Sequence, residues 1–196
     1  MNRWIYRLMY TLGMANWDTG QTSPELQDLF EQEASPPGAA LDLGCGTGTN
    51  AIFMARQGRQ VIGLDYVPKA IRLAHRKAQR AGVADRTRFK VADVTHLDAL
   101  DLPSVAIALD MGCFHGLDRA GRGRYAAQLA GLMPAGGVFL LYTLDPHNDA
   151  GVQFGVMPED VKRTFAPWFA VTRIQRGTQG GNGSTWFRME RCEGSP

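Results

Sequence analysis

Cysteine is scarce in this chain of 196 residues: Cys45, Cys113 and Cys192 are the only three, and they lie far apart. Such spacing matches neither a zinc site nor a disulfide framework, so we expect no metal centre and a reducing, cytoplasmic setting. Long uncharged runs are also missing. Arg3 and Arg7 interrupt the apolar start of the chain, and we therefore expect neither a signal peptide nor a membrane span.

An excess of charge of one sign is missing too. The chain has 21 basic and 19 acidic residues, a formal net charge of +2, which gives no electrostatic basis for a nucleic-acid partner. No internal repeat and no linker divides the sequence. With 44% hydrophobic residues, a chain of this length suits one domain with its own core. The composition leaves the oligomeric state open.

The first part of the chain predicts two helices. Apolar residues recur at helical spacing over 4–12, which indicates an amphipathic helix. A loop follows, and Ser23 can then cap a second helix that has Pro24 at its first position. Pro36 ends this helix.

From residue 39 onward, apolar strands alternate with amphipathic helices. We predict strands at 39–43, 59–65, 88–93, 104–112 and 136–144, helices at 49–58, 68–82, 124–133 and 158–167, and a closing antiparallel pair at 169–176 and 184–193. This alternation is typical of a Rossmann-like, doubly wound α/β fold whose seven-stranded sheet is mainly parallel. We therefore predict one domain over 1–196, with N-terminal helices and a lid at 1–37 and the Rossmann-like core at 38–196.

The most informative motif is LDLGCGTG, at 41–48, between the first predicted strand of the core and its helix. Gly44, Gly46 and Gly48, with Cys45 among them, allow a tight turn and a close approach of a ligand to the backbone. Asp42 precedes the first glycine by two positions. The spacing is G-x-G-x-G, unlike the G-x-G-x-x-G of dinucleotide sites. The alternative is an ordinary turn between strand and helix.

Acidic residues follow the next two strands. Asp65 can accept both hydroxyls of a ribose, and Tyr66 can lie along an adenine ring. Asp93 can accept the adenine amino group, while the backbone N–H of Val94 faces the ring. Each aspartate has a local alternative: Asp65 can cap the following helix, and Asp93 can bond within its own turn.

Together, the glycine motif, Asp65 and Asp93 resemble class I S-adenosylmethionine-dependent methyltransferases over most of the chain. The resemblance implies S-adenosylmethionine as cofactor and S-adenosylhomocysteine as its product. A narrower one lies in NWDTGQTSPEL, at 16–26, which is similar to the N-terminal motif of halide/thiol and thiopurine methyltransferases. It implies that Trp17 and Gly20 lie near the methionine end of the cofactor. The stretch 142–165 is similar to the same group, in which it helps to close the acceptor pocket.

The segment DMGCFHGL follows the fourth predicted strand of the core, where this resemblance implies that the reactive methyl group lies. Asp110 and Met111 are expected beside it, and Phe114 is expected to wall the pocket. Asp110 and His115 are the candidate catalytic residues, and His115 can serve as a base, as a polar contact or as a structural residue. Thiopurine enzymes tend to carry Arg, and halide/thiol enzymes Tyr, where this chain has Met111.

The acceptor is expected to be a small molecule, and neither a nucleic acid nor a membrane. The apolar loop after the fourth strand favours a thiol, sulfide or similar soft nucleophile. Two alternatives stay open: a phenol or carboxylate acceptor, and a non-catalytic cofactor-binding module. A nicotinamide-dependent oxidoreductase would carry G-x-G-x-x-G and a Tyr-x-x-x-Lys pair, and an amino-methylating nucleic-acid enzyme a Pro-Pro-aromatic run. The sequence has none of these.

Overall fold

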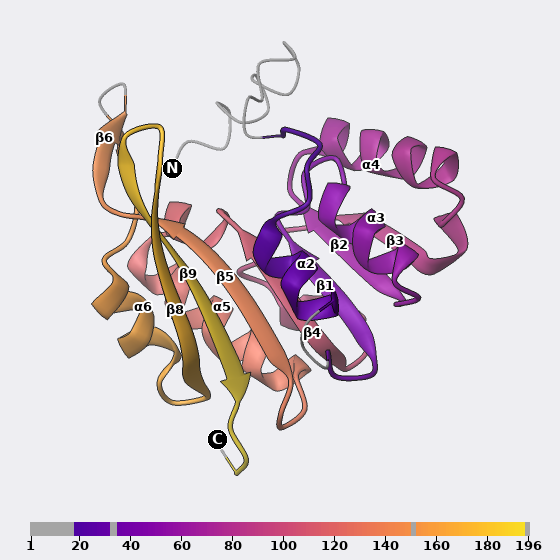
Figure 1. The fold of residues 1–196 in the computed structure, drawn as a ribbon. Helices are drawn as coiled ribbons and strands as arrows, with labels where there is room; N and C mark the ends of the chain where they lie inside the picture. The colour runs from indigo at the N-terminus through magenta and orange to yellow at the C-terminus, as the bar shows by residue number, and fades with distance from the viewer. Residues whose placement is uncertain (1–17, 32–34, 150–151, 195–196) are drawn as a thin grey trace.

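A computed structural model of the chain describes residues 18–31, 35–149 and 152–194 (Figure 1). The helix predicted over 4–12, its role as a lid, and Trp17 lie outside these residues and stay predictions. Within the described ranges, no helix is both long and apolar enough to cross a membrane.

The described elements follow the predicted alternation. The helices are α2 (Pro24–Glu31), α3 (Thr49–Arg56), α4 (Pro68–Arg80), α5 (Arg119–Leu132) and α6 (Pro158–Phe165). The strands are β1 (Ala39–Leu43), β2 (Val61–Asp65), β3 (Thr87–Val91), β4 (Val105–Met111), β5 (Val138–Leu144), β6 (His147–Asp149), β7 (Val152–Phe154), β8 (Phe169–Gln179) and β9 (Asn182–Arg191). Short 3-10 helices are η1 (Ala84–Arg86), η2 (Leu97–Ala99) and η3 (Phe114–Gly116).

Seven strands form one sheet in the order β3-β2-β1-β4-β5-β9-β8. The first five of these are parallel, and β9 pairs antiparallel with both β5 and β8. The strand order therefore reverses between β1 and β4, and in such sheets ligands bind beyond the carboxyl ends of the strands at this switch point. The predicted fold class is confirmed.

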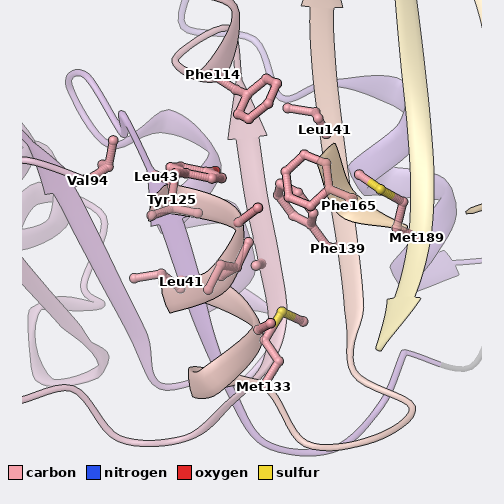
Figure 2. Packing of buried hydrophobic residues seen from close by; sticks show 14 of the residues in the cluster. Leu41, Leu43, Val94, Phe114, Tyr125, Met133, Phe139, Leu141, Phe165 and Met189 are labelled. Atoms are coloured by element: carbon pink, nitrogen blue, oxygen red, sulfur yellow. The ribbon is translucent and has the colours of Figure 1, made fainter. Parts of the chain in front are cut away.

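Helices cover both faces of the sheet (Figure 1). Leu26 and Leu29 of α2 pack with α3 and α4 against one face, while α5 and α6 pack against the other. The second face has an aromatic centre in which Tyr125, Phe139 and Phe165 are fully buried (Figure 2). Their ring centroids are 5.4–6.4 Å apart at tilted or edge-on angles, as aromatic side chains in protein cores prefer.

The predicted start of α5 is wrong by five residues, because the helix begins at Arg119 and not at 124. Gly121 and Gly123 weaken the helical pattern in its first turns, since glycine has a low helix propensity. The start signal is Asp118, whose Oδ1 accepts the N–H of Gly121 at 2.7 Å as an N-cap.

Three other local predictions need correction. Ser23 precedes α2 as expected, but its buried hydroxyl makes no hydrogen bond within the described part of the chain, so it is not a side-chain cap there. The third strand ends at Val91, which places Asp93 in the turn beyond it. The β6–β7 ribbon was not predicted, because strands of three residues are too short to show alternation. The final hairpin extends to a two-residue turn at 180–181, where both glycines have positive φ.

Candidate active site

The glycine motif forms the turn between β1 and α3. Gly44 has φ +75°, and a Cβ there would stand 2.8 Å from the Cβ of Cys113 in the loop after β4. Gly48 has φ +83°, and a Cβ there would stand 2.9 Å from the ring of Phe89. Side chains at these positions would therefore push the turn away from the loop after β4 and from Phe89 of β3. Buried Cys45 and Gly46 lie between the two glycines.

Asp65 ties this turn to the end of β2. Its two carboxylate oxygens accept the N–H groups of Gly46 at 3.0 Å and of Val67 at 2.8 Å. Burial raises the pKa of Asp65, and these two hydrogen bonds oppose the rise. Val67 is itself the N-cap of α4, and this helix has no side-chain cap in the described structure, so the bond to Val67 lies within the loop and is not the helix cap named as the alternative role. Each oxygen keeps a second lone pair, so this contact leaves room for a ligand hydroxyl.

Asp42 is a buried carboxyl group beneath the same turn. Only 2% of its surface is exposed, and its Oδ2 has no hydrogen-bond partner in the described structure. Burial raises the pKa of Asp42 to about 7, against a backbone hydrogen bond from Ala51, and the charges of Asp110 and Asp65 raise it further. Three carboxyl groups thus gather at the carboxyl ends of β1, β2 and β4.

The residues predicted at the adenine side lie around the next loop. The Oδ1 of Asp93 accepts hydrogen bonds from the N–H of Thr95 at 3.0 Å and from the Thr95 hydroxyl at 2.7 Å. Asp93 therefore makes the bonds within its own turn that were named as its alternative role. The side chain of Val94 is buried in the core. Tyr66 is half-buried against Val67 and Ala70. Asp93 and Tyr66 stand at the carboxyl edge of the sheet.

The start of the described chain lies against the glycine turn. Lys77 of α4 is hydrogen-bonded to the hydroxyl of Thr47, and its Nζ is 3.8 Å from a carboxylate oxygen of Asp18. Gly20, two residues further on, has φ +73°. Asp18 is also close enough to raise the pKa of Asp65. Asp18 of the WDTG segment therefore reaches the predicted cofactor side, whereas Trp17 lies outside the described residues.

Asp110 is the best-enclosed polar group of the site. None of its surface is exposed: Oδ1 accepts the N–H of Cys113 at 2.7 Å, and Oδ2 accepts the N–H of Phe114 at 3.0 Å and the hydroxyl of Tyr125 at 2.8 Å. Burial raises the pKa of Asp110 to about 6, and the Tyr125 hydroxyl is the strongest of the hydrogen bonds that oppose this rise. This enclosed carboxylate holds the loop after β4 by its hydrogen bonds, and the catalytic role of Asp110 stays a prediction.

Phe114 does not wall a pocket, contrary to the prediction. It is fully buried in the core, 5.1 Å from Phe165 and 5.5 Å from Tyr125 between ring centroids (Figure 2). The hydrogen bonds to Asp110 turn the backbone so that this side chain enters the aromatic cluster.

Met111, the last residue of β4, is exposed at the end of the strand. It is 43% exposed, and its sulfur accepts a hydrogen bond from the side-chain amide of Asn50 at 3.5 Å. The Oδ1 of Asn50 in turn accepts the N–H of Ser23, before α2, at 3.4 Å. Asn50 was not among the predicted site residues, although its place in the first turn after the glycine motif is visible in the sequence.

His115 is held as a neutral imidazole. It is 8% exposed, and burial, followed by the charges of Arg122 and His147, lowers its pKa to about 4. Its Nδ1 accepts the backbone N–H of Leu144 at 3.3 Å, so the proton of the neutral ring is on Nε2. His115 is therefore a hydrogen-bond donor with little basicity.

Two further residues of the site were missed in the sequence. Tyr125 bonds Asp110, and Arg122 donates to the carbonyl oxygen of His115 at 2.9 Å. They are three residues apart in α5 and so lie on one face of the helix. Had Asp118 been recognised in the sequence as the N-cap of α5, this spacing would have indicated that Tyr125 and Arg122 share a face of the helix.

Removing the Tyr125 hydroxyl should destabilise the protein in a pH-dependent way. The pKa of Asp110 is about 6 in the folded protein and 3.8 for an ordinary aspartate. The stabilising contribution of Asp110 is therefore fully present below pH 3.8 and is lost as the pH rises through 6. Tyr125→Phe removes a bond that lowers this pKa, so the loss extends to higher pH. We expect a cost of about 0.5–1.5 kcal/mol at pH 5 and about 1.5–3 kcal/mol at pH 8.

Denaturant unfolding of Tyr125→Phe at both pH values measures this difference. In an Asp110→Asn background the same substitution should show no pH dependence. Equal costs at pH 5 and pH 8 in the otherwise unchanged protein would contradict the assignment of charge to Asp110.

Comparison of the sequence with known proteins shows which family the chain belongs to. The sequence pattern of thiopurine S-methyltransferase matches residues 2–182. A 2-heptyl-1-hydroxyquinolin-4(1H)-one methyltransferase of Mycobacteroides abscessus is 31% identical over 66% of this chain and 56% of its own length. A thiopurine S-methyltransferase of Shewanella pealeana is 30% identical over 66% of this chain and 65% of its own. The chain thus spans less than two thirds of the length of either relative.

The fold also recurs in solved structures. The 1,6-didemethyltoxoflavin-N1-methyltransferase of Burkholderia thailandensis, solved with S-adenosylhomocysteine, superposes with a TM-score of 0.79 at 20% identity, over 97% of this chain and 87% of that one. At this identity the likeness concerns the fold alone. The family pattern, in contrast, covers nearly the whole sequence, and the chain therefore belongs to the thiopurine S-methyltransferase family.

Proposed function

We propose that this chain is an S-adenosylmethionine-dependent methyltransferase that acts on a small-molecule acceptor with a thiol, sulfide or similar soft nucleophile. The observation that carries the proposal is the convergence of Asp42, Asp65 and the glycine turn at the switch point between β1 and β4. Membership of the thiopurine S-methyltransferase family supports the same chemistry.

The residues at this edge fit S-adenosylmethionine. Its ammonium and sulfonium groups are cationic, and the unpaired Oδ2 of Asp42 and the neighbouring Asp65 give this edge negative charge. When bound, the cofactor supplies a methyl group on a positively charged sulfur. Asp65 is the residue that would accept the ribose hydroxyls, with Asp93 and Tyr66 on the adenine side and Gly20, Gly44 and Gly46 along the methionine side.

The work of the protein in such a transfer is to align the nucleophile and to exclude water. Asp110 holds the loop after β4 in one conformation, which makes it a positioning residue. Met111 presents a polarizable, apolar side chain at the end of β4, which suits a soft nucleophile. His115 donates from Nε2 and so would stabilise a nucleophile that arrives as an anion.

One relative favours a second candidate. The Mycobacteroides abscessus enzyme is named for a hydroxyquinolinone, an acceptor that carries a hydroxyl group. Oxygen acceptors such as phenols therefore belong in any test beside thiols.

The cofactor assignment predicts that Asp65→Ala binds S-adenosylmethionine and S-adenosylhomocysteine at least about tenfold more weakly, because the loss of a charged hydrogen-bond acceptor costs about 1.5–3 kcal/mol. Isothermal calorimetry measures both affinities. Asp85→Ala, at an exposed aspartate in η1, is the matched control and should bind normally. Unchanged affinity in Asp65→Ala would remove this residue from the site, and binding of NADH in place of the cofactor would refute the function.

The acceptor assignment predicts methyl transfer to sulfide and small thiols in preference to phenols. A thiol has a pKa of about 8.5 and a phenol one of about 10, so the thiol provides more anion at neutral pH without a base. Labelled S-adenosylmethionine and a panel of sulfide, alkyl thiols, halides, aryl thiols and matched phenols give the comparison. Methylation of phenols with none of sulfide or thiols would select the second candidate.

His115 gives a further prediction. Because its pKa of about 4 leaves it neutral from pH 6 to 9, the ratio of wild-type to His115→Ala rates should be constant over this range. We expect a loss of about 10- to 100-fold, the value of one hydrogen bond to a charged group. His115→Gln, which keeps an N–H donor, should recover part of the rate. A ratio that titrates between pH 6 and 8 would instead identify His115 as a base.

A further inference from the structure

Arg122 joins two segments that lie far apart in the sequence. Its Nη2 donates to the carbonyl oxygen of His115 at 2.9 Å, in η3 after β4, and to that of Gly155 at 3.0 Å, just after β7. The Cζ atom of the guanidinium lies 5.6 Å from the centroid of the Phe114 ring. One side chain of α5 therefore bridges the loop after β4 and the base of the β6–β7 ribbon.

These bonds belong to a closed circuit. The Nδ1 of His115 accepts the N–H of Leu144, the last residue of β5, and the carbonyl of Leu144 accepts the N–H of Val156 at 2.9 Å. The chain then returns through Gly155 to Arg122. The two arms of the ribbon also pack closely at this point: a Cβ on Gly155 would stand 2.3 Å from the carbonyl oxygen of Asp145. The circuit therefore connects η3, the end of β5, the base of the β6–β7 ribbon and α5.

Arg122 has an environment that costs stability. It is half-buried, its Nε has no hydrogen-bond partner in the described structure, and burial lowers its pKa in spite of the nearby charge of Asp118. An apolar side chain would fill this space without the desolvation of a charge. What an apolar side chain cannot do is donate to both carbonyl groups at once.

We propose that Arg122 is a positioning residue for the methyl acceptor: through this circuit it sets where the His115 ring and the β6–β7 ribbon stand. The proposal rests on the proposed function, in which Nε2 of His115 meets the acceptor. Cofactor residues of β1 and β2 take no part in the circuit. Loss of Arg122 therefore affects the acceptor step and spares cofactor binding.

Arg122→Met tests this, with Arg124→Met at an exposed position of the same helix as control. We expect kcat/KM for the acceptor to fall about 100-fold in Arg122→Met, the effect of a displacement near 1 Å, with the calorimetric affinity for S-adenosylhomocysteine unchanged. Arg122→Lys keeps a donor within the circuit and should retain more activity than Arg122→Met. Arg124→Met should match the unmodified protein in both assays.

An NMR measurement supplies a readout independent of turnover. Removing the like charge of Arg122 should raise the pKa of His115 from about 4, and amide exchange should accelerate at Leu144 and Val156 but not at Gly46. A folded Arg122→Met protein with normal kcat/KM, or one that loses cofactor affinity to the same extent, would overturn the inference. If the unmodified protein methylates no acceptor, the proposed function fails instead.

Discussion

The buried carboxylate of Asp110 decides the conformation of the loop on which the site depends. A carboxylate with no exposed surface is stable only when its oxygens are hydrogen-bonded, and here two backbone N–H groups and the Tyr125 hydroxyl meet that demand. The same bonds turn the chain after β4 into η3. Phe114 consequently enters the aromatic core, while Met111 remains exposed at the carboxyl edge of the sheet. The core and the site are therefore shaped by the same set of contacts.

The two neighbouring carboxyl groups, those of Asp65 and Asp42, differ from Asp110 in their hydrogen bonds. Asp65 bonds the backbone of the glycine turn and of its own loop, whereas one oxygen of Asp42 has no partner among the described residues and its pKa is raised to about 7. The charges of Asp110 and Asp65 oppose the ionisation of Asp42, because like charges in a poorly solvated region repel. A cationic ligand bound at this edge would relieve that repulsion. The negative charge at the switch point thus favours cations there independently of any single hydrogen bond.

Local sequence patterns were sufficient for the sheet and the glycine turn. Strands β1, β2 and β4 are short apolar runs, and the glycines of 41–48 make a turn whose geometry follows from their missing side chains. The face that Phe114 takes could not be predicted in this way, since it depends on Asp110 and on the packing of α5 and α6. The tautomer of His115 is equally non-local, because it follows from the N–H of Leu144, 29 residues along the chain. Trp17 lies outside the described residues and keeps its predicted role.

The state of His115 also bears on which acceptors the site favours. A neutral imidazole with a pKa of about 4 removes few protons near pH 7, so the nucleophile must lose its proton largely to the solvent. Its Nε2–H, in contrast, strengthens as a hydrogen-bond donor when the nucleophile is an anion. Under the proposed function, such a site would select acceptors by their own acidity: thiols at about 8.5 are partly ionised at neutral pH, phenols at about 10 much less, and aliphatic alcohols hardly at all. Acidity would then unite acceptors that differ in the reacting atom. A sulfur acceptor and a sufficiently acidic hydroxyl could share this site for the same electrostatic reason, whereas an alcohol of the same shape would not react.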